Sequence, residues 1–509
     1  MNANVGTFLH RWANEDPDRA AIIDTGRGGL QVSYASLDAQ ASMVAGALVA
    51  RGLEPGDRVA ICMDNGLEFA SAWFGCVYAG CTTLPIPAMA TAREIAFRLR
   101  HANCHALLCD ESHEAIAAEA KALAQTATVV LAAAEAAHAA HGHAGPVICD
   151  PDAIAMILYT SGTTGSAKGV CVNHRSLASH TDALVHHTLC LTSRDRILGV
   201  LPLTHSYGIR MTLLVPFYAG ASTVFAPRFS AERALELCSE HRVTWLPGVP
   251  TMFVAWANMT QGKAPPSLRW CMSSGAPLVE GARLRAESRL GAPVRQGYGL
   301  TEATFSTINA PPDKASPGSV GAPVHGVELR IETQAGIVAM AGERGEVLVR
   351  GPNVMAGYLG DEEATAAVVH DGWVHTGDIG YLDDEGRLTV VDRRKDIILR
   401  GGHSVYPFEV EDALALHPAV ADVAVVGKPD DYYGEEIVGI IVARTPLSAQ
   451  ELDAWVREHL SPIKVPRAYA FIDALPLGPS GKTLKRALRA QVAEGEIPLR
   501  LVADDAPAQ

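Results

Sequence analysis

The chain has 509 residues, a length at which a single hydrophobic core stops growing, so two or more domains are expected. Hydrophobic residues make up 48% and charged residues 19%, a composition typical of soluble globular proteins. The net charge of −14 argues against nucleic acid as the main partner, because phosphate backbones attract basic faces. No uninterrupted apolar stretch of about 18 residues occurs, so no membrane span is expected.

The N-terminal residues predict an amphipathic helix instead of a secretion signal. Within residues 7–16, Phe8, Leu9 and Trp12 would face inward, and charged residues come early in the chain. The ten cysteines are scattered and form no C-x-x-C pair, so we expect buried thiols and not metal ligands. These features predict a cytoplasmic protein.

The first half of the chain alternates strand-like and helix-like segments. Short apolar runs at 58–63, 82–86, 106–109 and 128–131 are interpreted as strands, and the run that begins at residue 70 as a core helix. Asp64 and Asn65 are expected to cap the helix that follows the first run. Such β-α-β alternation indicates parallel sheets flanked by helices.

From residue 345 the pattern changes to short strands bounded by glycine and charged turns. Residues 345–351 and 386–392 predict a small antiparallel sheet. After residues 393–396 comes a compact α+β unit, with helices expected at 409–416 and 449–460, strands at 423–426 and 437–442, and a final helix. The expected fold is a large N-terminal α/β domain, residues 1–394, of parallel or mixed sheets flanked by helices plus a small antiparallel β subdomain. A small α+β C-terminal domain, residues 395–509, follows it.

A loop rich in glycine and hydroxyl groups follows an apolar run at 154–158. Residues 159–170, YTSGTTGSAKGV, contain three glycines, five Ser or Thr residues and one lysine, and precede a helix-like stretch. Glycine lets backbone N–H groups turn toward a phosphate, hydroxyls donate further hydrogen bonds, and Lys168 adds a positive charge. The spacing does not match the Walker pattern of P-loop kinases, because Gly165 and Lys168 are not adjacent. The loop is therefore predicted to hold a nucleotide's phosphates in another way.

Two further motifs suit the rest of a nucleotide. SSGAP, residues 273–277, follows a hydrophobic run at 268–272, and its small residues permit a flat base to lie against the backbone. In QGYGLTEA, residues 296–303, Tyr298 can stack on adenine, Thr301 can bond a phosphate, and Glu302 can hold Mg²⁺ against phosphate oxygens.

Together with HTGD at 375–378 and PSGKTLKR at 479–486, these motifs closely resemble, in content and order, the signatures of the adenylate-forming superfamily. That superfamily contains acyl-CoA synthetases, firefly luciferases and nonribosomal peptide adenylation domains, and the chain is most similar to a free-standing acyl-CoA synthetase. The resemblance implies a carboxylic acid–CoA ligase with two half-reactions. The acid and ATP give an acyl adenylate and pyrophosphate, and CoA then gives acyl-CoA and AMP. ATP, Mg²⁺, CoA and a small carboxylic acid are thus the implied ligands, and the protein would be a monomer or homodimer.

The resemblance also assigns the nucleotide site. Asp378 would accept hydrogen bonds from the ribose hydroxyls, and Arg393 would donate to the ribose or a phosphate. Lys482 would bind the carboxylate and the α-phosphate, where a positive charge offsets the repulsion of two anions and stabilises the transition state. The expected ATP or AMP contacts are Thr160, Ser161, Gly162, Thr163, Thr164, Gly165, Lys168, Ser274, Gly275, Ala276, Gln296, Gly297, Tyr298, Gly299, Thr301, Asp378, Arg393 and Lys482. The expected catalytic residues are Lys482, His205, Glu302 and Thr160, with Glu302 as the Mg²⁺ ligand.

LPLTHSYG, residues 201–208, matches the motif whose histidine, here His205, borders the acyl pocket. The pocket is expected to comprise His205, Tyr207, Arg210, Met211, Val249, Phe305 and Ser306. Phe305 would shorten it and so favour a small, aromatic or medium-chain acid. Arg210 has two open interpretations: it pairs with a second carboxylate on the substrate, or it faces outward or pairs with a protein carboxylate.

The second half-reaction requires a second orientation of the small domain, with the hinge at Lys395. In that orientation Gly401 and Gly402 would replace Lys482 beside the acyl adenylate and give the pantetheine arm close passage. Arg400 or Lys428 would meet a phosphate of CoA.

Two alternatives to a CoA ligase stay open at this point. One is an acyl-AMP ligase that loads the pantetheine thiol of a carrier protein. Such ligases usually carry an insertion near the end of the large domain, and residues 351–392 leave no room for one. The other is a binding or regulatory protein that retains ATP without turnover. The presence of Lys168, Glu302, Asp378 and Lys482 disfavours it.

Overall fold

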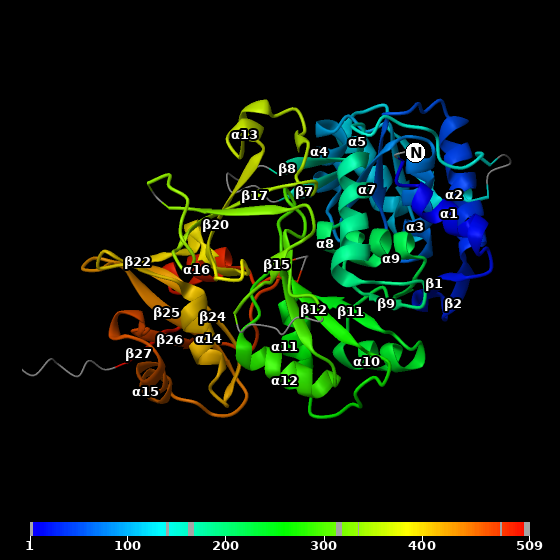
Figure 1. Ribbon diagram of the computed structural model, residues 1–509. Coiled ribbons are helices and arrows are strands. Elements are labelled where there is room, and N and C mark those ends of the chain that lie inside the picture. The colour runs from blue at the N-terminus through cyan, green and yellow to red at the C-terminus, as the bar shows by residue number, and fades with distance from the viewer. Residues whose placement is uncertain are drawn as a thin grey trace, which may run out of the picture.

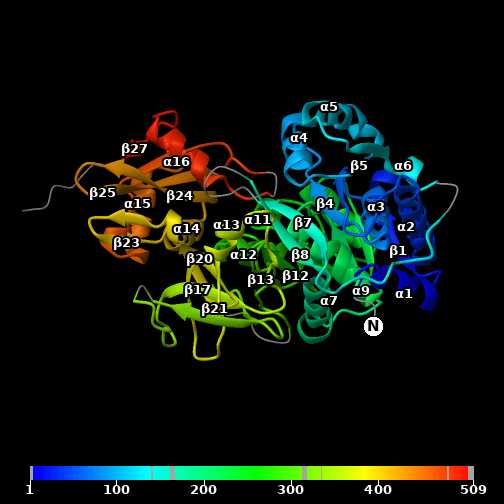
Figure 2. The ribbon, with the colours of Figure 1, turned by 90° about the horizontal axis from the view of Figure 1, so that it is seen from above.

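The computed structural model describes residues 4–138, 142–160, 167–311, 318–333, 335–478 and 481–502. Elements from the first part of the chain gather at one end of the molecule, and the elements after residue 395 gather at the other (Figure 1). The view from above shows the same separation of the two ends (Figure 2).

A mixed sheet organises the N-terminal part, in the order β18–β8–β7–β4–β3–β5–β6. Its strands are β3 (Arg58–Cys62), β4 (Thr82–Ile86), β5 (Ala106–Cys109), β6 (Val129–Ala132), β7 (Ile154–Thr160), β8 (Lys168–Asn173) and β18 (Gly357–Tyr358). The strands β7, β4, β3, β5 and β6 are parallel, which confirms the alternation read from the sequence. Helices α2 (Tyr34–Val49), α3 (Leu67–Tyr78), α4 (Ala92–His101), α5 (Glu114–Ala124) and α6 (Ala133–Ala136) belong to this part of the chain. Every residue of α3 except the partly exposed Glu68 is buried, as its apolar sequence requires.

A second sheet runs in the order β15–β14–β13–β12–β11–β9–β10–β1–β2, with parallel pairing from β13 through to β1. Its strands are β1 (Ala20–Asp24), β2 (Leu30–Ser33), β9 (Arg196–Gly199), β10 (Ser222–Phe225), β11 (Trp245–Gly248), β12 (Trp270–Ser274), β13 (Val294–Tyr298), β14 (Thr307–Ile308) and β15 (Ala322–Pro323). The associated helices are α1 (Thr7–Glu15), α7 (His174–Asp182), α8 (Ser206–Ile209), α9 (Val215–Ala219), α10 (Ala231–Glu240), α11 (Pro250–Asn258) and α12 (Glu280–Leu290). The SSGAP and QGYG motifs thus begin at the carboxyl ends of the neighbouring strands β12 and β13, the edge where ligands bind in parallel sheets.

An antiparallel sheet follows, as the glycine-bounded strands predict. It contains β16 (Glu328–Glu332), β17 (Gly345–Arg350), β19 (Val369–His370), β20 (Trp373–Leu382) and β21 (Leu388–Arg393), with the short helix α13 (Glu362–Ala366) before β19. The small domain then contains β22 (Ile398–Arg400), β23 (His403–Val405), β24 (Val420–Asp430), β25 (Gly434–Ala443), β26 (Ala468–Phe471), β27 (Arg500–Leu501), α14 (Pro407–Ala415), α15 (Ala449–His459) and α16 (Lys485–Ala493). The helices and strands predicted for this domain are present. The helices α14 and α15 begin and end within two residues of their expected limits, whereas the strands β24 and β25 extend beyond their expected limits at both ends.

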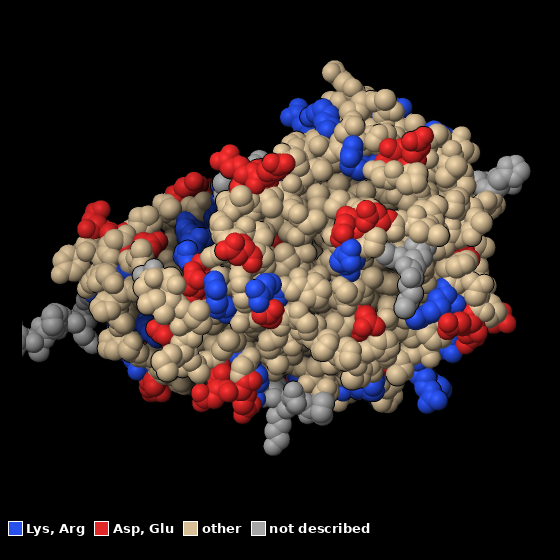
Figure 3. Space-filling model, turned by 45° about the horizontal axis from the view of Figure 1, so that its top comes forward, with Lys and Arg blue, Asp and Glu red and all other residues tan. Residues whose placement is uncertain are grey.

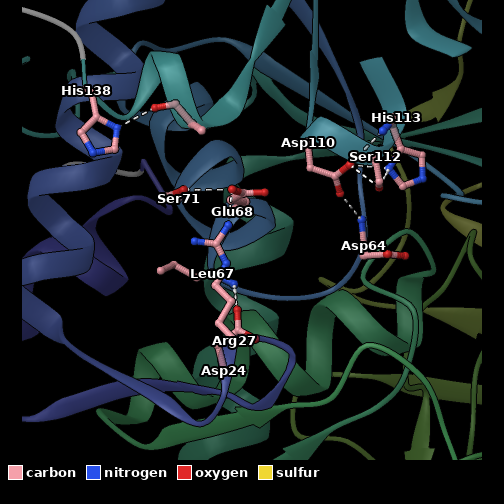
Figure 4. A network of polar contacts seen from close by, with 11 residues as sticks. Asp24, Arg27, Asp64, Leu67, Glu68, Ser71, Asp110, Ser112, His113 and His138 are labelled. Carbon is pink, nitrogen blue, oxygen red and sulfur yellow. Dashed lines mark hydrogen bonds and ion pairs between the residues drawn. The ribbon is translucent and has the colours of Figure 1, made fainter. Parts of the chain in front are cut away.

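Two local predictions were wrong. Residue 168 opens a strand, not a helix-like stretch: β8 pairs antiparallel with β7, and α7 begins only at His174. The second error concerns the N-terminus of α3. Its first residue is preceded by Gly66, and Asp24 from β1 accepts the hydrogen bond of Leu67 N at 2.9 Å (Figure 4). Asp64 instead donates its backbone N–H to Asp110 Oδ2 at 3.0 Å.

The charged residues do not form a large patch of one sign on the face shown in Figure 3, where acidic and basic side chains are interspersed. Among the residues that the structure describes, no helix combines the length and apolar character needed to cross a membrane.

Candidate active site

Tyr298 and Asp378 meet although they lie 80 positions apart in the sequence. Tyr298 ends β13, and its hydroxyl donates to Asp378 Oδ2 at 2.6 Å. Asp378 lies in β20 opposite Arg393 of β21, whose Nε is 3.2 Å from the other carboxylate oxygen. Burial raises the pKa of Asp378, while the charge of Arg393 and the Tyr298 hydrogen bond lower it. The carboxylate is therefore fixed in orientation, as an acceptor of two adjacent hydroxyls must be.

Glu302 is linked to the lysine of the glycine-rich loop through one tyrosine. Tyr358, in β18, donates its hydroxyl to Glu302 Oε1 at 2.8 Å. The ammonium of Lys168 lies 4.8 Å from the centre of the Tyr358 ring, a cation–π contact. Lys168 pairs with Thr160 across β7 and β8, so both ends of the loop are fixed by the sheet. Tyr358 had no role in the sequence predictions, because nothing in its local context marks it.

Lys482 reaches the large domain from the small one. The carbonyl of the preceding Gly481 accepts a hydrogen bond from Thr251 Oγ1 at 2.7 Å. A Cβ atom built on Gly275 would lie 3.2 Å from Lys482 Cε, so the lysine stem passes directly against the SSGAP turn. Gly275 has a φ of +94°, which L-residues rarely adopt. The loop that carries Lys482 and the SSGAP turn thus lie in contact.

Lys482 is in a strongly charged environment. Burial, and then the charge of Arg393, lower its pKa to about 8, whereas Asp378 and Glu302 act in the opposite direction. Burial, and then the charge of Lys482, lower the pKa of His205 to about 4, so the imidazole is neutral at physiological pH. The residues that the motifs predicted for adenylation therefore interact electrostatically with one another in the folded chain.

The expected acyl residues pack around Tyr207. His205 caps α8, and its Nδ1 accepts the hydrogen bond of Tyr207 N at 3.3 Å. The Tyr207 ring meets Phe305 edge to face, with 5.2 Å between ring centres. Its hydroxyl lies 2.7 Å from the carbonyl oxygen of Met272. Six of the seven acyl residues are less than 7% exposed: Tyr207, Arg210, Met211, Val249, Phe305 and Ser306. Ser306 is fully buried.

The walls expected for adenine are held by backbone contacts. Ser274 Oγ donates to the carbonyl of Gly297 at 2.7 Å, which ties β12 to β13. A Cβ atom on Gly299 would lie 2.3 Å from a backbone nitrogen, so only glycine fits there. Gln296 uses its side-chain oxygen to accept the N–H of Leu278 at 3.0 Å. Its amide thus shapes the SSGAP turn.

The model of the AMP-binding enzyme family matches residues 9–359, and that of its C-terminal domain matches residues 409–482. The chain belongs to the AMP-binding enzyme family. It is 34% identical to the sulfoacetate–CoA ligase of Cupriavidus necator, covering 93% of this chain and 94% of that protein. It is also 34% identical to the 2-succinylbenzoate–CoA ligase of Bacillus subtilis, over 96% of this chain and 98% of that one.

The fold agrees with solved structures of this family. The ATP-bound MatB structure from Rhodopseudomonas palustris superposes with a TM-score of 0.89 at 32% identity, covering 96% of this chain and 99% of that one. The AMP-binding family places the chain among ATP-dependent enzymes that join a carboxylic acid to CoA through an acyl adenylate. The large α/β domain with its small C-terminal domain is the architecture of these enzymes.

The residues present fit a magnesium ion held mainly by nucleotide phosphates. Among the residues that the structure describes, no group of three or more His, Cys, Asp and Glu side chains could hold a metal. A single carboxylate, Glu302, kept in place by Tyr358, suits Mg²⁺, which is often bound through one or two carboxylates together with substrate phosphates. When bound, the ion neutralises charge on the phosphates.

The remaining predicted residues lie elsewhere or outside the described residues. Ser161, Gly162, Thr163, Thr164 and Gly165 fall outside the part that the structure describes. Ala276, in the SSGAP motif, and Thr301, in the QGYGLTEA motif, are half-buried. Lys395 is exposed in a short turn, Arg394–Asp396, between β21 and β22.

Gly401 and Gly402 form the turn between β22 and β23, with φ values of +55° and +82°. Both ribbon views place this hairpin on the outer side of the small domain, away from β12 (Figures 1 and 2). The Arg400 side chain is buried and pairs with Glu436 at 2.7 Å, so the prediction that it meets a CoA phosphate is not supported in this orientation. Lys428 lines a pocket of about 410 Å³ with Arg467 and Tyr433 on the small domain.

Proposed function

We propose that the structure holds the small domain in the orientation that forms the acyl adenylate, with Lys482 as the catalytic cation. The observation that carries this proposal is the packing of the Lys482 side chain against Gly275. The carboxylates of Asp378 and Glu302 interact electrostatically with its ammonium group. Attack of a carboxylate on the α-phosphate brings two anions together, and a lysine at that point offsets their repulsion. Its lowered pKa leaves most of it protonated at neutral pH.

The nucleotide would be bound by the remaining motif residues. Asp378 would accept from the ribose hydroxyls, oriented by Tyr298 and Arg393. Lys168 and the loop that begins at Thr160 would hold the phosphates. The neutral imidazole of His205 would orient the reacting carboxylate without adding a charge of its own. Phe305 and Tyr207 would limit the length of the acid.

For the thioester step we propose that the small domain, residues 395–509, turns about Lys395. The turn at Gly401 and Gly402 would then replace Lys482 and leave room for the pantetheine arm. Lys428 and Arg467, which line the pocket of the small domain, would meet the phosphates of CoA. The need for ATP and CoA, and the free state of the cysteines, are consistent with a cytoplasmic location.

The Lys482→Ala variant tests the proposal. It should lose pyrophosphate formation from acid and ATP by about a hundredfold or more, because the charge at the reacting phosphate is gone. It should still convert a synthetic acyl adenylate and CoA into acyl-CoA. The matched control is Lys121→Ala, an exposed lysine of α5, which should change neither half-reaction. Equal loss of both half-reactions in Lys482→Ala would overturn the two-orientation assignment.

A further inference from the structure

A buried arginine lies among the expected acyl residues without a carboxylate partner in the described part of the chain. Arg210 is 2% exposed. Its Nη1 donates to Leu177 O and Thr181 Oγ1, each at 3.3 Å, and its Nη2 donates to Thr304 Oγ1 at 3.4 Å. All three acceptors are neutral and the bonds are long. Burial lowers the pKa of Arg210 to about 10, which still leaves the guanidinium charged at neutral pH.

The position of Arg210 prevents its charge from reaching solvent. Arg210 opens a π-helical turn, Arg210–Leu214, in which every residue is buried. An isolated buried charge is costly, and most buried charges are paired. Turns of this kind occur often at functional sites. The interpretation in which Arg210 faces outward is wrong, and the described residues offer no carboxylate to pair with it.

A second buried polar group lies on the same side of the acyl residues. His180, in α7, is fully buried, and its Nε2–H donates to the carbonyl of Phe305 at 3.2 Å. Its Nδ1 has no hydrogen-bond partner among the described residues. Burial, and then the charge of Arg210, hold the pKa of His180 well below its ordinary value, so a neutral ring lies near the arginine cation. The Nδ1 atom of His180 thus leaves hydrogen-bonding capacity unused inside the protein, near the charge of Arg210.

Arg210 and His180 contact residues of the segment that follows Glu302. Arg210 follows His205 by five positions, and the residues between them form the short helix α8. Thr304, which Arg210 contacts, follows Glu302, the proposed magnesium ligand, by two positions. The carbonyl that His180 contacts belongs to Phe305, whose ring packs on Tyr207.

We propose that Arg210 and His180 bind a second acidic group at the far end of the substrate, a carboxylate or a sulfonate, so that the enzyme acts on short diacids. This inference rests on the proposed function of the same site. The distal group accepts hydrogen bonds from Arg210 and supplies the counter-charge that the fold lacks. A proton that enters with the acid is taken up at Nδ1 of His180, which then donates to the same group.

The test compares dicarboxylic acids with monocarboxylic acids and with neutral ω-amide acids of the same length, in wild type and in Arg210→Met. Wild type should prefer the diacids in kcat/KM. Arg210→Met should lower kcat/KM for diacids by about tenfold to a hundredfold, mainly through KM, and leave the KM for ATP unchanged. Arg210→Lys should recover part of the loss, because it keeps the charge. The matched control is Arg350→Met, an exposed arginine paired with Glu328, which should not change the ratio.

The outcomes of this test distinguish the inference from a structural role of Arg210 and from a failure of the proposed function. If Arg210→Met lowered kcat/KM by the same factor for diacids and for monoacids, the role of Arg210 would be purely structural. Equal use of ω-amide acids and diacids by wild type would show that the distal group need not be charged. Calorimetry measures the binding of a diacid without turnover. Binding that is lost in Arg210→Met supports the inference even where no acyl-CoA forms. Equal binding to wild type and to Arg210→Met contradicts it. Absence of acyl-CoA with every acid would count against the proposed function alone.

Discussion

Gly275 and Lys482 face each other across the two domains, with 3.2 Å between a Cβ built on the glycine and Cε of the lysine. The Gly275→Ala variant should therefore lose both stability and adenylation activity. Its φ of +94° costs a non-glycine residue about 1–2 kcal/mol of stability, and the added methyl pushes the lysine away. We expect a lower Tm and slower pyrophosphate formation, measured by thermal denaturation and by isotope exchange.

Gly386→Ala separates these two effects. Gly386 has a φ of +75° and no atom within 4 Å of an added Cβ, so this variant should lose stability but keep its adenylation rate. If both glycine variants lost adenylation in proportion to their stability, contact with Lys482 would not matter.

The hydroxyl of Tyr298 orients Asp378. The Tyr298→Phe variant removes a 2.6 Å hydrogen bond to a buried carboxylate, a loss of about 1–3 kcal/mol. The KM for ATP should rise by about fivefold to a hundredfold, because the ribose acceptor is no longer held in place. Tyr381→Phe, on the same strand as Asp378, is the control and should leave the KM for ATP as it is. A similar KM in both variants would contradict the role of Tyr298.

Tyr358 is expected to govern the affinity for magnesium. In Tyr358→Phe, Glu302 loses its 2.8 Å hydrogen bond while the ring beside Lys168 remains. The Mg²⁺ concentration for half-maximal pyrophosphate formation should rise by about threefold to tenfold. Tyr432→Phe, at a tyrosine that is 85% exposed, should behave as wild type. An unchanged Mg²⁺ requirement in Tyr358→Phe would contradict a role of Tyr358 at the metal site.

The pH dependence of adenylation should report Lys482. Burial and then Arg393 lower its pKa to about 8, so the free enzyme loses the required charge as the pH rises through about 8. The profile of kcat/KM for adenylation should therefore fall above this pH. Lys482→Arg, which stays protonated, should lower the rate but remove the fall. A fall at the same pH in both enzymes would assign the titration to another group.

The interface between the domains should favour the adenylation orientation. Arg444 of the small domain donates to Asn258 Oδ1 of the large domain at 2.6 Å through Nη2. The Arg444→Ala variant should slow adenylation by about twofold to fivefold and leave the thioester step unaffected, because the contact is exposed and weak. Arg457→Ala serves as the control, because its partner Asp453 lies in the same helix. Equal slowing of both half-reactions by Arg444→Ala would place the contact in both orientations.

Sequence patterns predicted most of this architecture because its strands are short apolar runs and its site residues come in contiguous motifs. The strands at Thr82–Ile86 and Ala106–Cys109 were predicted with their observed limits. The motif residues Tyr298, Asp378 and Lys482 come together in the structure.

The errors and omissions concern contacts between residues that are distant in the sequence. Asp24 caps a helix 43 positions later, and Tyr358 reaches Glu302 across 56 positions. The hydrophobic periodicity of a sequence does not predict such long-range contacts. His180 was missed for the same reason, because its partner carbonyl is 125 positions away. The antiparallel pairing of Lys168 with Thr160 likewise depends on the sheet and not on local propensity.

The most direct test of the account is a product analysis of the wild-type enzyme with ATP, Mg²⁺, CoA and a panel of short mono- and dicarboxylic acids. The account predicts that acyl-CoA, AMP and pyrophosphate appear in equal amounts, and that omission of CoA leaves only an acyl adenylate and pyrophosphate. Formation of ADP and phosphate, or of an acyl adenylate that CoA does not convert to a thioester, would contradict it.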